Sequence, residues 1–505
     1  MLTLKDQHVL ILGLGLSGLA LARWCARCGA QVTVADTRSD PPQLAALRHE
    51  LPLARFVSGV FDASLFRGAE YSRVLKSPGL TPQEVALVYQ AARASGIKTS
   101  GELGLFAQAL ADLKSTRDYQ PKVLAVTGTN GKTTVTSLTG QLINRAGKAV
   151  AVAGNIGPTL LDTLSERLDA DALPEVWVIE LSSFQLDGET AFEASAATVL
   201  NITQDHLDWH GTMLDYSGAK ANVFGRQALM VLNREDPAVM AMLPQPVRVK
   251  LQRPSHRRYV TFGGNMPARA GDFGIEQVNG MAWLVRAQDA DETLKNRKGS
   301  EAELFVQRLM PVDALRIRGR HNALNALAAL ALASAAGCSL GPILYGLREY
   351  RGERHRVESI GIFNAVEFFD DSKGTNVGAT VAAINGLGGE RKVIVILGGE
   401  GKGQDFSPLV EPVSRNTRAV VLIGRDAPKI RVALQASGVP LMDANSMAQA
   451  VALAFGQAQA GNAILMSPAC ASFDMFDNYE HRAQVFREAV KELASAAGVE
   501  MEGAL

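Results

Sequence analysis

Residues 121–134 have the sequence PKVLAVTGTNGKTT, an apolar run that leads into a glycine-containing loop. The run predicts a strand over Pro121–Val126, followed by a loop at Gly128–Thr133 and then a helix. Backbone N–H groups of such a loop close around phosphate oxygens, the lysine neutralises their charge and the hydroxyl reaches Mg²⁺. Position 126 is valine where the full pattern has glycine, so an ordinary glycine turn is the alternative. The order of strand, loop and helix favours binding of a nucleoside triphosphate.

The same alternation of strand, glycine turn and helix recurs on both sides of this loop. Towards the N-terminus, His8–Leu12 and Gln31–Asp36 are short apolar runs separated by a glycine turn and a helical stretch, and His321–Gly337 predicts a later helix. Further buried strands are predicted at Val176–Glu180, Ala197–Ile202, Ala228–Leu232, Ala365–Asp370, Val393–Leu397, Val420–Ile423 and Ala463–Met466. This pattern predicts an α/β fold with mostly parallel sheets.

The alternation restarts twice, which divides the chain into three predicted domains, each a mostly parallel sheet with flanking helices. Within the second domain, residues 263–316 alternate polar and apolar side chains and contain Asn279-Gly280. This stretch predicts a β-rich excursion, with a mobile loop in the charged segment Asp289–Glu303. The three predicted domains span residues 1–100, 101–351 and 352–505.

Composition and charge exclude several classes of protein. The 505 residues include 51 Lys and Arg against 51 Asp and Glu, so the balanced charge argues against a nucleic-acid or membrane-surface partner. Val9–Ala22 is uncharged, but Lys5 is offset by Asp6, so a signal peptide is not expected. Four cysteines are too few for a disulfide scaffold. A soluble cytoplasmic protein without membrane insertion is predicted.

The N-terminal segment contains a second glycine loop. Gly13–Gly18, GLGLSG, fits the dinucleotide-binding fingerprint, and Asp36 follows at a strand end about 20 residues on. The pattern requires only that a diphosphate approach a helix N-terminus, so any nucleotide diphosphate satisfies it. Thr37-Arg38 and Ser77-Pro78-Gly79 lie in loops that can complete such a site. We predict diphosphate binding, with a nicotinamide cofactor as the alternative.

Polar side chains in the second domain indicate a metal site. Glu180 closes a buried strand, so it is a candidate Mg²⁺ ligand, although a solvated strand end is possible. His206 and His210 have i, i+4 spacing, but the glutamate of a zinc helix is absent. We therefore predict a magnesium or substrate role for His206 and a structural role for His210. From its surroundings in the sequence alone, Lys220 is a surface lysine.

The third domain has three polar loops at strand ends. These are Asp370–Asn376, Gly398–Gly403 and Ser467–Asp474, and each is a candidate ligand-binding loop. A nucleophilic role for Cys470 has no base partner nearby in the sequence. The pair Cys25 and Cys28 lies within a predicted helix, where buried thiols are expected.

Taken together, these motifs resemble the ATP-dependent Mur ligases of peptidoglycan precursor synthesis. The forms GGEGKG and SPACASFD are similar to those of the members that add D-glutamate, and the DNPR-type motif of the diamino-acid ligases is absent. Folylpolyglutamate synthases share the central loop but do not begin with a UDP-type domain. The motifs that carry the resemblance run in family order as GLGLSG, ADTR, KSPGL, TGTNGKTT, GNIG, ELSSFQL, NITQDHLDWH, RGRHNALNALAAL, ERHRVE, DDSKGTNVGAT, LGGEGKGQDFSPL and SPACASFDMFDNYEHR.

The resemblance implies a fold and a reaction. It implies Rossmann-like first and third domains around a P-loop ATPase domain. It also implies an enzyme that joins D-glutamate to UDP-N-acetylmuramoyl-L-alanine through an acyl phosphate, giving ADP and phosphate. ATP, two Mg²⁺ ions and a CO₂-derived carbamate on Lys220 are the implied cofactors, and the enzyme is expected to act as a monomer. The carbamate reverses the surface interpretation of Lys220, because it makes that side chain an anionic metal ligand.

The resemblance also implies roles for particular residues. UDP-sugar contacts are Gly15, Ser17, Asp36, Thr37, Arg38, Ser77, Gly79 and Asn155. ATP contacts are Gly128, Thr129, Asn130, Gly131, Lys132, Thr133, Thr134, Asn322, Arg356 and Asp371. Metal ligands are Thr133, Glu180, His206 and the carbamate of Lys220, and the catalytic group is Lys132, Glu180, His206 and Lys220. D-Glutamate contacts are Lys373, Thr375, Lys402, Ser472 and Tyr479.

Two features depart from the family pattern, and other functions remain open. Tyr479 stands where the family can have phenylalanine, and Gln288–Leu309 is longer than expected and has no predicted catalytic role. An NAD-dependent oxidoreductase would explain GLGLSG but not the GKT loop. A nucleotide-sugar sensor would not need Glu180, Lys220 and His206 together. A Mur ligase for another amino acid is the nearest alternative.

Overall fold

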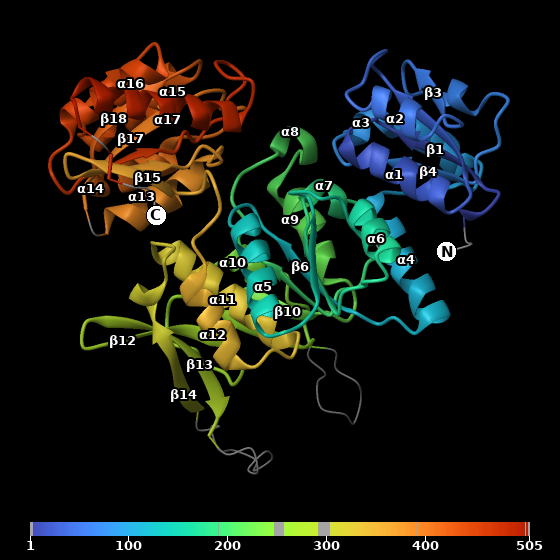
Figure 1. The fold of residues 1–505 in the computed structure, drawn as a ribbon, viewed down its shortest axis with the longest axis horizontal. Helices are drawn as coiled ribbons and strands as arrows, with labels where there is room; N and C mark the ends of the chain where they lie inside the picture. The colour runs from blue at the N-terminus through green and yellow to red at the C-terminus, as the bar shows by residue number, and fades with distance from the viewer. Residues whose placement is uncertain are drawn as a thin grey trace.

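The computed structural model describes residues 4–189, 191–246, 257–290, 304–389, 391–499 and 501–502, and this part of the chain forms three separate sheets. Figure 1 shows them as three bodies, coloured blue, cyan to yellow, and orange to red along the chain. The two outer bodies lie on either side of the central one, with the short helix α8 (Leu207–His210) between them in this view. The predicted α/β class, with mostly parallel sheets and flanking helices, is confirmed.

The first sheet is parallel throughout and has the strand order β3-β2-β1-β4-β5. The chain order reverses between β1 and β4, so a crevice opens at their carboxyl ends, where ligands bind in such sheets. Gly18 is required here, because a Cβ on it would lie 2.0 Å from the Gly13 carbonyl oxygen. The elements are β1 (His8–Leu12), α1 (Leu16–Arg27), β2 (Gln31–Asp36), α2 (Leu44–Glu50), β3 (Arg55–Ser58), β4 (Arg73–Lys76), α3 (Pro82–Ala94) and β5 (Lys98–Ser100).

The second sheet has nine strands in the order β14-β13-β12-β11-β10-β9-β6-β8-β7. Strands β6 to β12 run parallel, and β13 and β14 complete an antiparallel meander, which confirms the β-rich excursion. The strands are β6 (Lys122–Thr127), β7 (Val150–Gly154), β8 (Val176–Glu180), β9 (Ala196–Val199), β10 (Leu229–Asn233), β11 (Tyr259–Phe262), β12 (Phe273–Val278), β13 (Met281–Asp289) and β14 (Leu304–Pro311). The mobile loop predicted beyond Asp289 falls at residues 291–303, outside the described residues.

Helices cover both faces of this second sheet. The alanine-rich helix α11 is buried along most of its length and packs beside α5, which explains its apolar character. The helices are α4 (Glu102–Arg117), α5 (Lys132–Arg145), α6 (Leu160–Asp169), α7 (Ser183–Leu186), α8 (Leu207–His210), α9 (Met213–Ala221), α10 (Pro237–Met240), α11 (Arg320–Ala335) and α12 (Leu340–Glu349). None of the described helices is long and apolar enough to span a membrane.

The third sheet has the order β15-β16-β20-β17-β18-β19, with β15 antiparallel and the others parallel. Its central strand β17 is buried at every residue, as expected for a parallel sheet covered on both faces. The strands are β15 (Glu358–Phe363), β16 (Val366–Asp370), β17 (Val393–Gly398), β18 (Thr417–Ile423), β19 (Leu441–Asp443) and β20 (Ala463–Met466). The helices are α13 (Val377–Gly388), α14 (Val410–Asn416), α15 (Ala427–Leu434), α16 (Met447–Gln457) and α17 (Tyr479–Ala496).

Most predicted elements were placed within three residues of their observed bounds, and two details need correction. The strand predicted over Ala197–Ile202 ends at Val199, because the side chain of Asn201 leaves the sheet and accepts a hydrogen bond from the Asn130 N–H at 2.8 Å. The strand predicted from Val420 begins earlier, at Thr417. The boundaries of the three domains stay predictions, although each sheet lies within one of the predicted spans.

The buried thiols predicted for Cys25 and Cys28 are confirmed. All four cysteines are described and none forms a disulfide, and Cys25, Cys28 and Cys470 are buried. Burial raises the pKa of the Cys25 and Cys470 thiols to about 12, so neither forms a thiolate readily. A nucleophilic role for Cys470 therefore has no support in the fold.

Candidate active site

The phosphate loop lies between β6 and α5, and its glycines are required by close contacts. A Cβ on Gly128 would lie 3.0 Å from the Leu200 backbone nitrogen, and one on Gly131 would lie 2.7 Å from Asn325 Oδ1. Both glycines also have positive φ angles, 146° and 85°. Val126 departs from the glycine pattern because it is a fully buried residue inside β6, before the loop begins.

Lys132 begins α5 and folds back over this loop. Its ammonium donates hydrogen bonds to the carbonyl oxygens of Gly128 and Thr129, both at 2.9 Å. Burial lowers the pKa of Lys132, and the Glu180 carboxylate opposes this shift. The ammonium is therefore held by the loop that would surround a phosphate, as the sequence predicts for a P-loop lysine.

Glu180 and Lys220 lie beside the phosphate loop, and both side chains are buried. Glu180 ends β8 at 1% exposure, and its Oε1 accepts a hydrogen bond from Asn155 Nδ2 at 2.9 Å. Its Oε2 has no hydrogen-bond partner among the described residues. The Lys220 ammonium donates to Gly128 O at 2.9 Å and to Thr127 Oγ1 at 3.3 Å. At 2% exposure, Lys220 is not the surface residue that its sequence surroundings suggest.

The buried charges of this group affect one another. Burial lowers the pKa of Lys220 well below its ordinary value, and the neighbouring Lys132 lowers it further. A buried carboxylate with an unpartnered oxygen is costly unless a cation or donor completes it. Glu180 is such a carboxylate, and a divalent cation such as Mg²⁺, which binds oxygen ligands, could complete its unpartnered oxygen.

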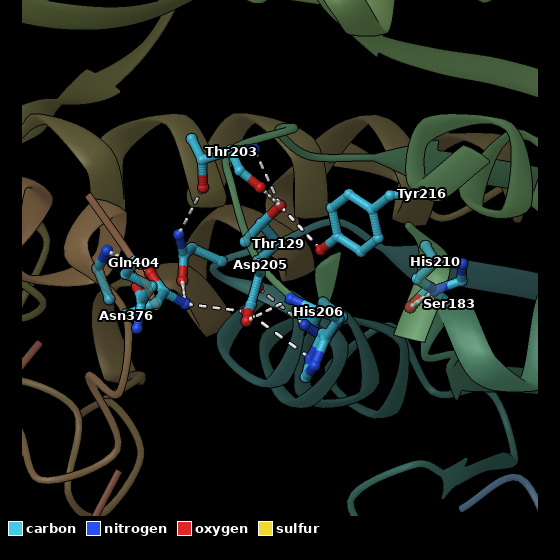
Figure 2. A network of polar contacts seen from close by, with 12 residues as sticks. Thr129, Ser183, Thr203, Asp205, His206, His210, Tyr216, Asn376 and Gln404 are labelled. Carbon is cyan, nitrogen blue, oxygen red and sulfur yellow. Dashed lines mark hydrogen bonds and ion pairs between the residues drawn. The ribbon is translucent and has the colours of Figure 1, made fainter. Parts of the chain in front are cut away.

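His206 lies on the other side of the loop, at the start of α8. Its backbone N–H donates to Asp205 Oδ1 at 3.0 Å, and its ring packs edge-on against Phe184 at 4.7 Å between centroids. Burial lowers the pKa of His206, which favours the neutral imidazole that binds metals. In Figure 2, His210 is hydrogen-bonded to Ser183 and lies apart from Asp205. This placement supports a structural interpretation of His210.

A small cavity of about 70 Å³ joins the phosphate loop to the third sheet. Six of the predicted ATP contacts line it: Asn130, Gly131, Thr134, Asn322, Arg356 and Asp371. Arg356 Nη2 donates to Thr133 Oγ1 at 2.6 Å, across the boundary between the two bodies. Burial raises the pKa of Asp371 to about 7, although the hydrogen bond that Asp371 accepts from Ser467 acts to lower it. The structure thus brings together residues that are up to 241 positions apart in the chain.

A larger cavity of about 860 Å³ is lined by residues of both the second and the third body. Thr133 of α5 lines it, and so do Lys373 and Tyr479 from the third body. The Lys373 ammonium lies 5.1 Å above the Tyr479 ring, and burial lowers the pKa of Lys373. Of the five predicted D-glutamate contacts, the structure brings these two to the cavity.

The other three predicted D-glutamate contacts do not line this cavity. Lys402 is exposed in a loop with positive φ, Ser472 is buried at 2% exposure, and the Thr375 N–H donates to the Lys373 carbonyl oxygen. The buried Arg482 organises this region, because it donates to Ser372 O and to Cys470 O. Arg482 carries no signal in the sequence beyond its place in the last motif.

The predicted UDP-sugar residues gather at the first sheet. Asp36 Oδ2 accepts from the Leu14 N–H at 2.7 Å, and Arg38 binds both carboxylate oxygens. Burial alone raises the pKa of Asp36, but the bonds from Arg38 and Leu14 outweigh it and lower the pKa to about 2. Gly15, Thr37, Ser77 and Gly79 lie in the loops at the same edge and Ser17 lies in the first turn of α1, and all five are exposed or partly buried. Asn155 is different, because it follows β7 in the second body and binds Glu180.

Several residues of the site were not predicted. Tyr216 donates or accepts a hydrogen bond with Thr129 Oγ1 at 3.1 Å and lies 4.8 Å from the Lys220 ammonium. Asn325 contacts Gly131, and its motif position three residues after Asn322 is the signal that could have found it. His355, next to Arg356, lines the large cavity and is hydrogen-bonded to Asp370 at 2.7 Å.

His355, Glu358 and Asp370 form a cluster of metal-type ligands with atoms within 4.8 Å of one another. Arg487 binds two of these residues, Asp370 at 3.1 Å and Glu358 at 2.5 Å. The arginine supplies the positive charge that a metal ion would otherwise provide. We therefore interpret this cluster as an ion-pair network.

The fold and the site define an ATP-dependent ligase of the Mur type, and comparisons with known proteins agree. Three family models match in order: the Mur ligase MurD-like N-terminal domain at residues 7–101, the Mur ligase middle domain at 126–333 and the Mur ligase glutamate ligase domain at 355–470. The chain belongs to the Mur ligase family.

Three curated relatives carry the same name. The UDP-N-acetylmuramoylalanine--D-glutamate ligase of Albidiferax ferrireducens is 76% identical over 501 residues, covering 99% of both chains. The protein of that name from Polaromonas sp. is 59% identical, covering 98% of this chain and 99% of its own. The third, from Ralstonia nicotianae, is 54% identical over 98% of this chain and 99% of its own.

Solved structures of the family share the fold. The MurF ligase from Thermotoga maritima in complex with ADP has a TM-score of 0.56 at 14% identity and covers 98% of both chains. The UDP-N-acetylmuramate-alanine ligase MurC from the same organism has a TM-score of 0.53 at 18% identity, covering 97% of this chain and all of its own. These likenesses support the three-domain α/β architecture.

Proposed function

We propose that this protein is the ligase that joins D-glutamate to UDP-N-acetylmuramoyl-L-alanine with ATP, in peptidoglycan precursor synthesis. The observation that carries the proposal is the large cavity, where Thr133 at the phosphate loop faces Lys373 and Tyr479 of the third body. The relative with 76% identity over its full length bears the name of this activity. The sequence motifs of the third domain favour D-glutamate over a diamino acid.

In the proposed reaction, a carboxylate oxygen of the L-alanine attacks the γ-phosphorus of ATP, and ADP leaves. The amine nitrogen of D-glutamate then attacks the acyl carbon, loses a proton and displaces phosphate. Lys132 and Arg356 carry positive charge beside Thr133 and stabilise the transferring phosphoryl group. The remaining rate enhancement comes from positioning the two reactants, and no enzyme nucleophile is needed.

Thr133, Glu180 and His206 would hold Mg²⁺. An Mg²⁺ ion held there would neutralise phosphate charge and help to orient the phosphoryl group. The unpartnered Glu180 Oε2 and the neutral imidazole of His206 support this assignment. Asn155 would keep the Glu180 carboxylate oriented through its hydrogen bond to Oε1.

We further propose that Lys220 reacts with CO₂ to form a carbamate. A carbamate forms when a neutral amine nitrogen bonds to the carbon of CO₂ and a proton leaves. The burial of Lys220, which lowers its pKa, supports this modification because it favours the neutral amine. The product would change the buried cation beside Lys132 into an anion that can bind the second Mg²⁺.

The remaining assignments follow the resemblance. Gly15, Ser17, Asp36, Thr37, Arg38, Ser77, Gly79 and Asn155 would bind the UDP-sugar, and Lys373, Thr375, Lys402, Ser472 and Tyr479 would bind D-glutamate. Asp36 is held by Arg38, so it is less suited to a free ribose of NAD, and the oxidoreductase alternative has little support. We propose domains over residues 1–100, 101–351 and 352–505 and a monomeric enzyme of the cytoplasm.

The proposal is tested by phosphate release from ATP and Mg²⁺ in the presence of UDP-N-acetylmuramoyl-L-alanine and bicarbonate. D-Glutamate, L-glutamate, L-lysine and diaminopimelate are added in turn, and the mass of the sugar nucleotide is measured by mass spectrometry. We expect release and a matching gain in mass with D-glutamate alone. Turnover with another amino acid would overturn the assigned acceptor, and no turnover with any of them would favour a sensor.

A further inference from the structure

Asn376 connects the third body to the phosphate loop, and the sequence predicts only that it ends the candidate ligand-binding loop Asp370–Asn376. It is the N-cap of α13 and is buried at 6% exposure. Its Oδ1 accepts a hydrogen bond from the Ala379 N–H at 2.8 Å, which is the usual N-cap interaction. Serine or aspartate would cap this helix equally well, so capping does not explain an amide here.

The amide nitrogen of Asn376 makes contacts that no capping role requires. It donates to Asn130 Oδ1 at 3.1 Å and to Asp205 Oδ2 at 3.3 Å, and both acceptors belong to the second body. Figure 2 shows Asn376 beside Gln404, to one side of Thr129 and Asp205, with a dashed line that reaches Asp205. The side-chain amide can donate two hydrogen bonds and accept two. Both donors are used across the boundary between the bodies, and one of the two acceptor lone pairs is used in the cap.

In the second body, the two acceptors Asn130 and Asp205 also form hydrogen bonds within the phosphate loop region and the His206 loop. The Asn130 N–H donates to Asn201 Oδ1 at 2.8 Å, which fixes the phosphate loop against the end of β9. Asp205 accepts from the backbone N–H of His206 at 3.0 Å. A rearrangement of either loop would remove an acceptor from Asn376.

On the side of the third body, the contacts continue to the loops predicted to bind the amino acid. The next residue, Val377, donates its N–H to Gln404 Oε1 at 3.0 Å. Gln404 Nε2 then donates to Gly401 O at 3.1 Å and to Ala469 O at 3.4 Å. Gly401 adjoins Lys402, and Ala469 lies in the loop that leads to Ser472.

The first turn of α13 has little room to move against the phosphate loop. A Cβ on Gly378 would lie 2.9 Å from Thr203 Oγ1 and 3.1 Å from Asn130 Nδ2. This close approach places the amide of Asn376 within reach of its two acceptors only when the bodies are docked. A bond made only in the docked arrangement favours that arrangement.

We propose that Asn376 is a positioning residue that couples docking of the third domain to an ordered phosphate loop and His206 loop. This inference rests on the proposed ligase function. With the coupling intact, the amino acid is in place when the acyl phosphate forms. Without it, the third domain docks less often, and water hydrolyses the acyl phosphate before the amine attacks it.

The decisive variant is Asn376→Ser. The serine hydroxyl can still cap the Ala379 N–H, but the side chain is too short and has no amide N–H to donate to Asn130 and Asp205. We expect kcat/KM for D-glutamate to fall about tenfold to a hundredfold, the factor for hydrogen bonds to a charged group. We also expect phosphate release to exceed product formation, whereas the two are equal in the wild type. Wild-type kinetics with equal phosphate and product would overturn the proposal.

Two further variants separate the amide from the cap. Asn376→Ala should lose thermal stability as well, while its excess phosphate should match that of Asn376→Ser. Ser446→Ala removes the exposed cap of α16, where Ser446 accepts from the Gln449 N–H, and should lower stability with no excess phosphate. Excess phosphate in Asn376→Ala and Ser446→Ala but not in Asn376→Ser would assign the effect to capping and overturn the proposal.

A charge exchange tests the bond to Asp205 directly. Asn376→Asp places a carboxylate next to that of Asp205 and should give the largest loss of kcat/KM among the Asn376 variants. Two carboxylates repel each other, and neither can donate a hydrogen bond to the other. Adding Asp205→Asn restores a donor and an acceptor across the boundary. The double variant should recover part of the loss relative to both single variants, and a simple addition of the two losses would contradict the bond.

A measurement without turnover keeps this inference separate from the proposed function. Small-angle X-ray scattering of the full chain with Mg²⁺ and a non-hydrolysable ATP analogue should show contraction of the wild type and less contraction of Asn376→Ser. Equal contraction would overturn the coupling whatever the substrate. Contraction of the wild type without ligation of any amino acid would leave the coupling in place and defeat the proposed function.

Discussion

The central body meets its two neighbours through interfaces of different kinds. Towards the first body, Arg23 pairs with Asp162 at 3.1 Å and Arg27 with Asp169 at 2.7 Å, between α1 and α6. Towards the third body, the contacts of Arg356 and Asn376 end on the phosphate loop and its surroundings. The first interface joins helix surfaces, whereas the second passes through the groups proposed to do the chemistry.

This difference indicates a division of labour between the two interfaces. Exposed ion pairs such as Arg27 with Asp169 contribute little stability and are weakened by salt. The hydrogen bond from Arg356 to Thr133 is made beside the phosphate site, so it affects the geometry of the reaction more than the stability of the fold. We therefore expect variants at the second interface to lose activity, and variants at the first to affect stability rather than activity, by only a small amount where they remove an exposed ion pair.

The largest expected effect lies at the second interface, in Lys132→Met. Removal of the ammonium should lower kcat/KM for ligation about a hundredfold to a thousandfold, the usual loss when a preorganised charge is removed. The thermal unfolding of the ligand-free variant should stay near that of the wild type, because methionine fills a similar volume. Initial rates and calorimetry check both points, and a loss below about tenfold would contradict the assigned role.

The next effect concerns Glu102, which lies where the first and second bodies join. It is 3% exposed and its Oε1 accepts from the Leu161 N–H at the start of α6. Burial raises the pKa of Glu102 to about 7, although that hydrogen bond opposes the rise. Between the ordinary pKa of a glutamate and about 7, the folded state holds more protons than the unfolded state, so stability falls as the pH rises through this window.

Glu102→Gln keeps the acceptor oxygen and removes the titration. We expect the variant to be more stable than the wild type at pH 8, by about 3 kcal/mol at most, and the difference to shrink towards pH 5. Asp371, whose pKa is also raised to about 7, contributes the same trend to both proteins and cancels in the difference. Urea unfolding at the two pH values measures it, and an equal difference at both would refute this interpretation of Glu102.

The smallest expected effect is that of Arg27→Ala. Its side chain is 33% exposed and that of Asp169 is 64% exposed, so loss of the pair should lower the free energy of unfolding by less than about 1 kcal/mol. Added salt should reduce the difference further. Urea unfolding at low and high salt checks this, and a loss of several kcal/mol would mean that the first interface depends on this pair.

The phosphate loop could be predicted from the sequence because its geometry is local. Strand, glycines and helix follow one another, and Gly128 and Gly131 adopt the positive φ angles that glycine favours. The valine at position 126 could not be explained in advance, since its burial inside β6 depends on the neighbouring strands β8 and β9.

Residues whose roles depend on distant segments were harder to predict. Lys220 resembles a surface lysine, and its burial arises from packing against Thr127 and Gly128, more than 90 positions away. Asn376 resembles an ordinary helix cap, because its two acceptors lie 246 and 171 positions away in another body. Such contacts have no periodicity or spacing that a single sequence can reveal.

The measurement that tests this account most directly is the initial rate of D-glutamate ligation in Arg356→Ala beside that in Arg27→Ala. The account predicts a loss of about tenfold to a hundredfold for Arg356→Ala, because a charged hydrogen bond at the phosphate loop is removed. It predicts a rate within about twofold of the wild type for Arg27→Ala, whose exposed pair is far weaker. Equal losses in the two variants, or a larger loss in Arg27→Ala, would contradict the assignment of catalysis to the second interface.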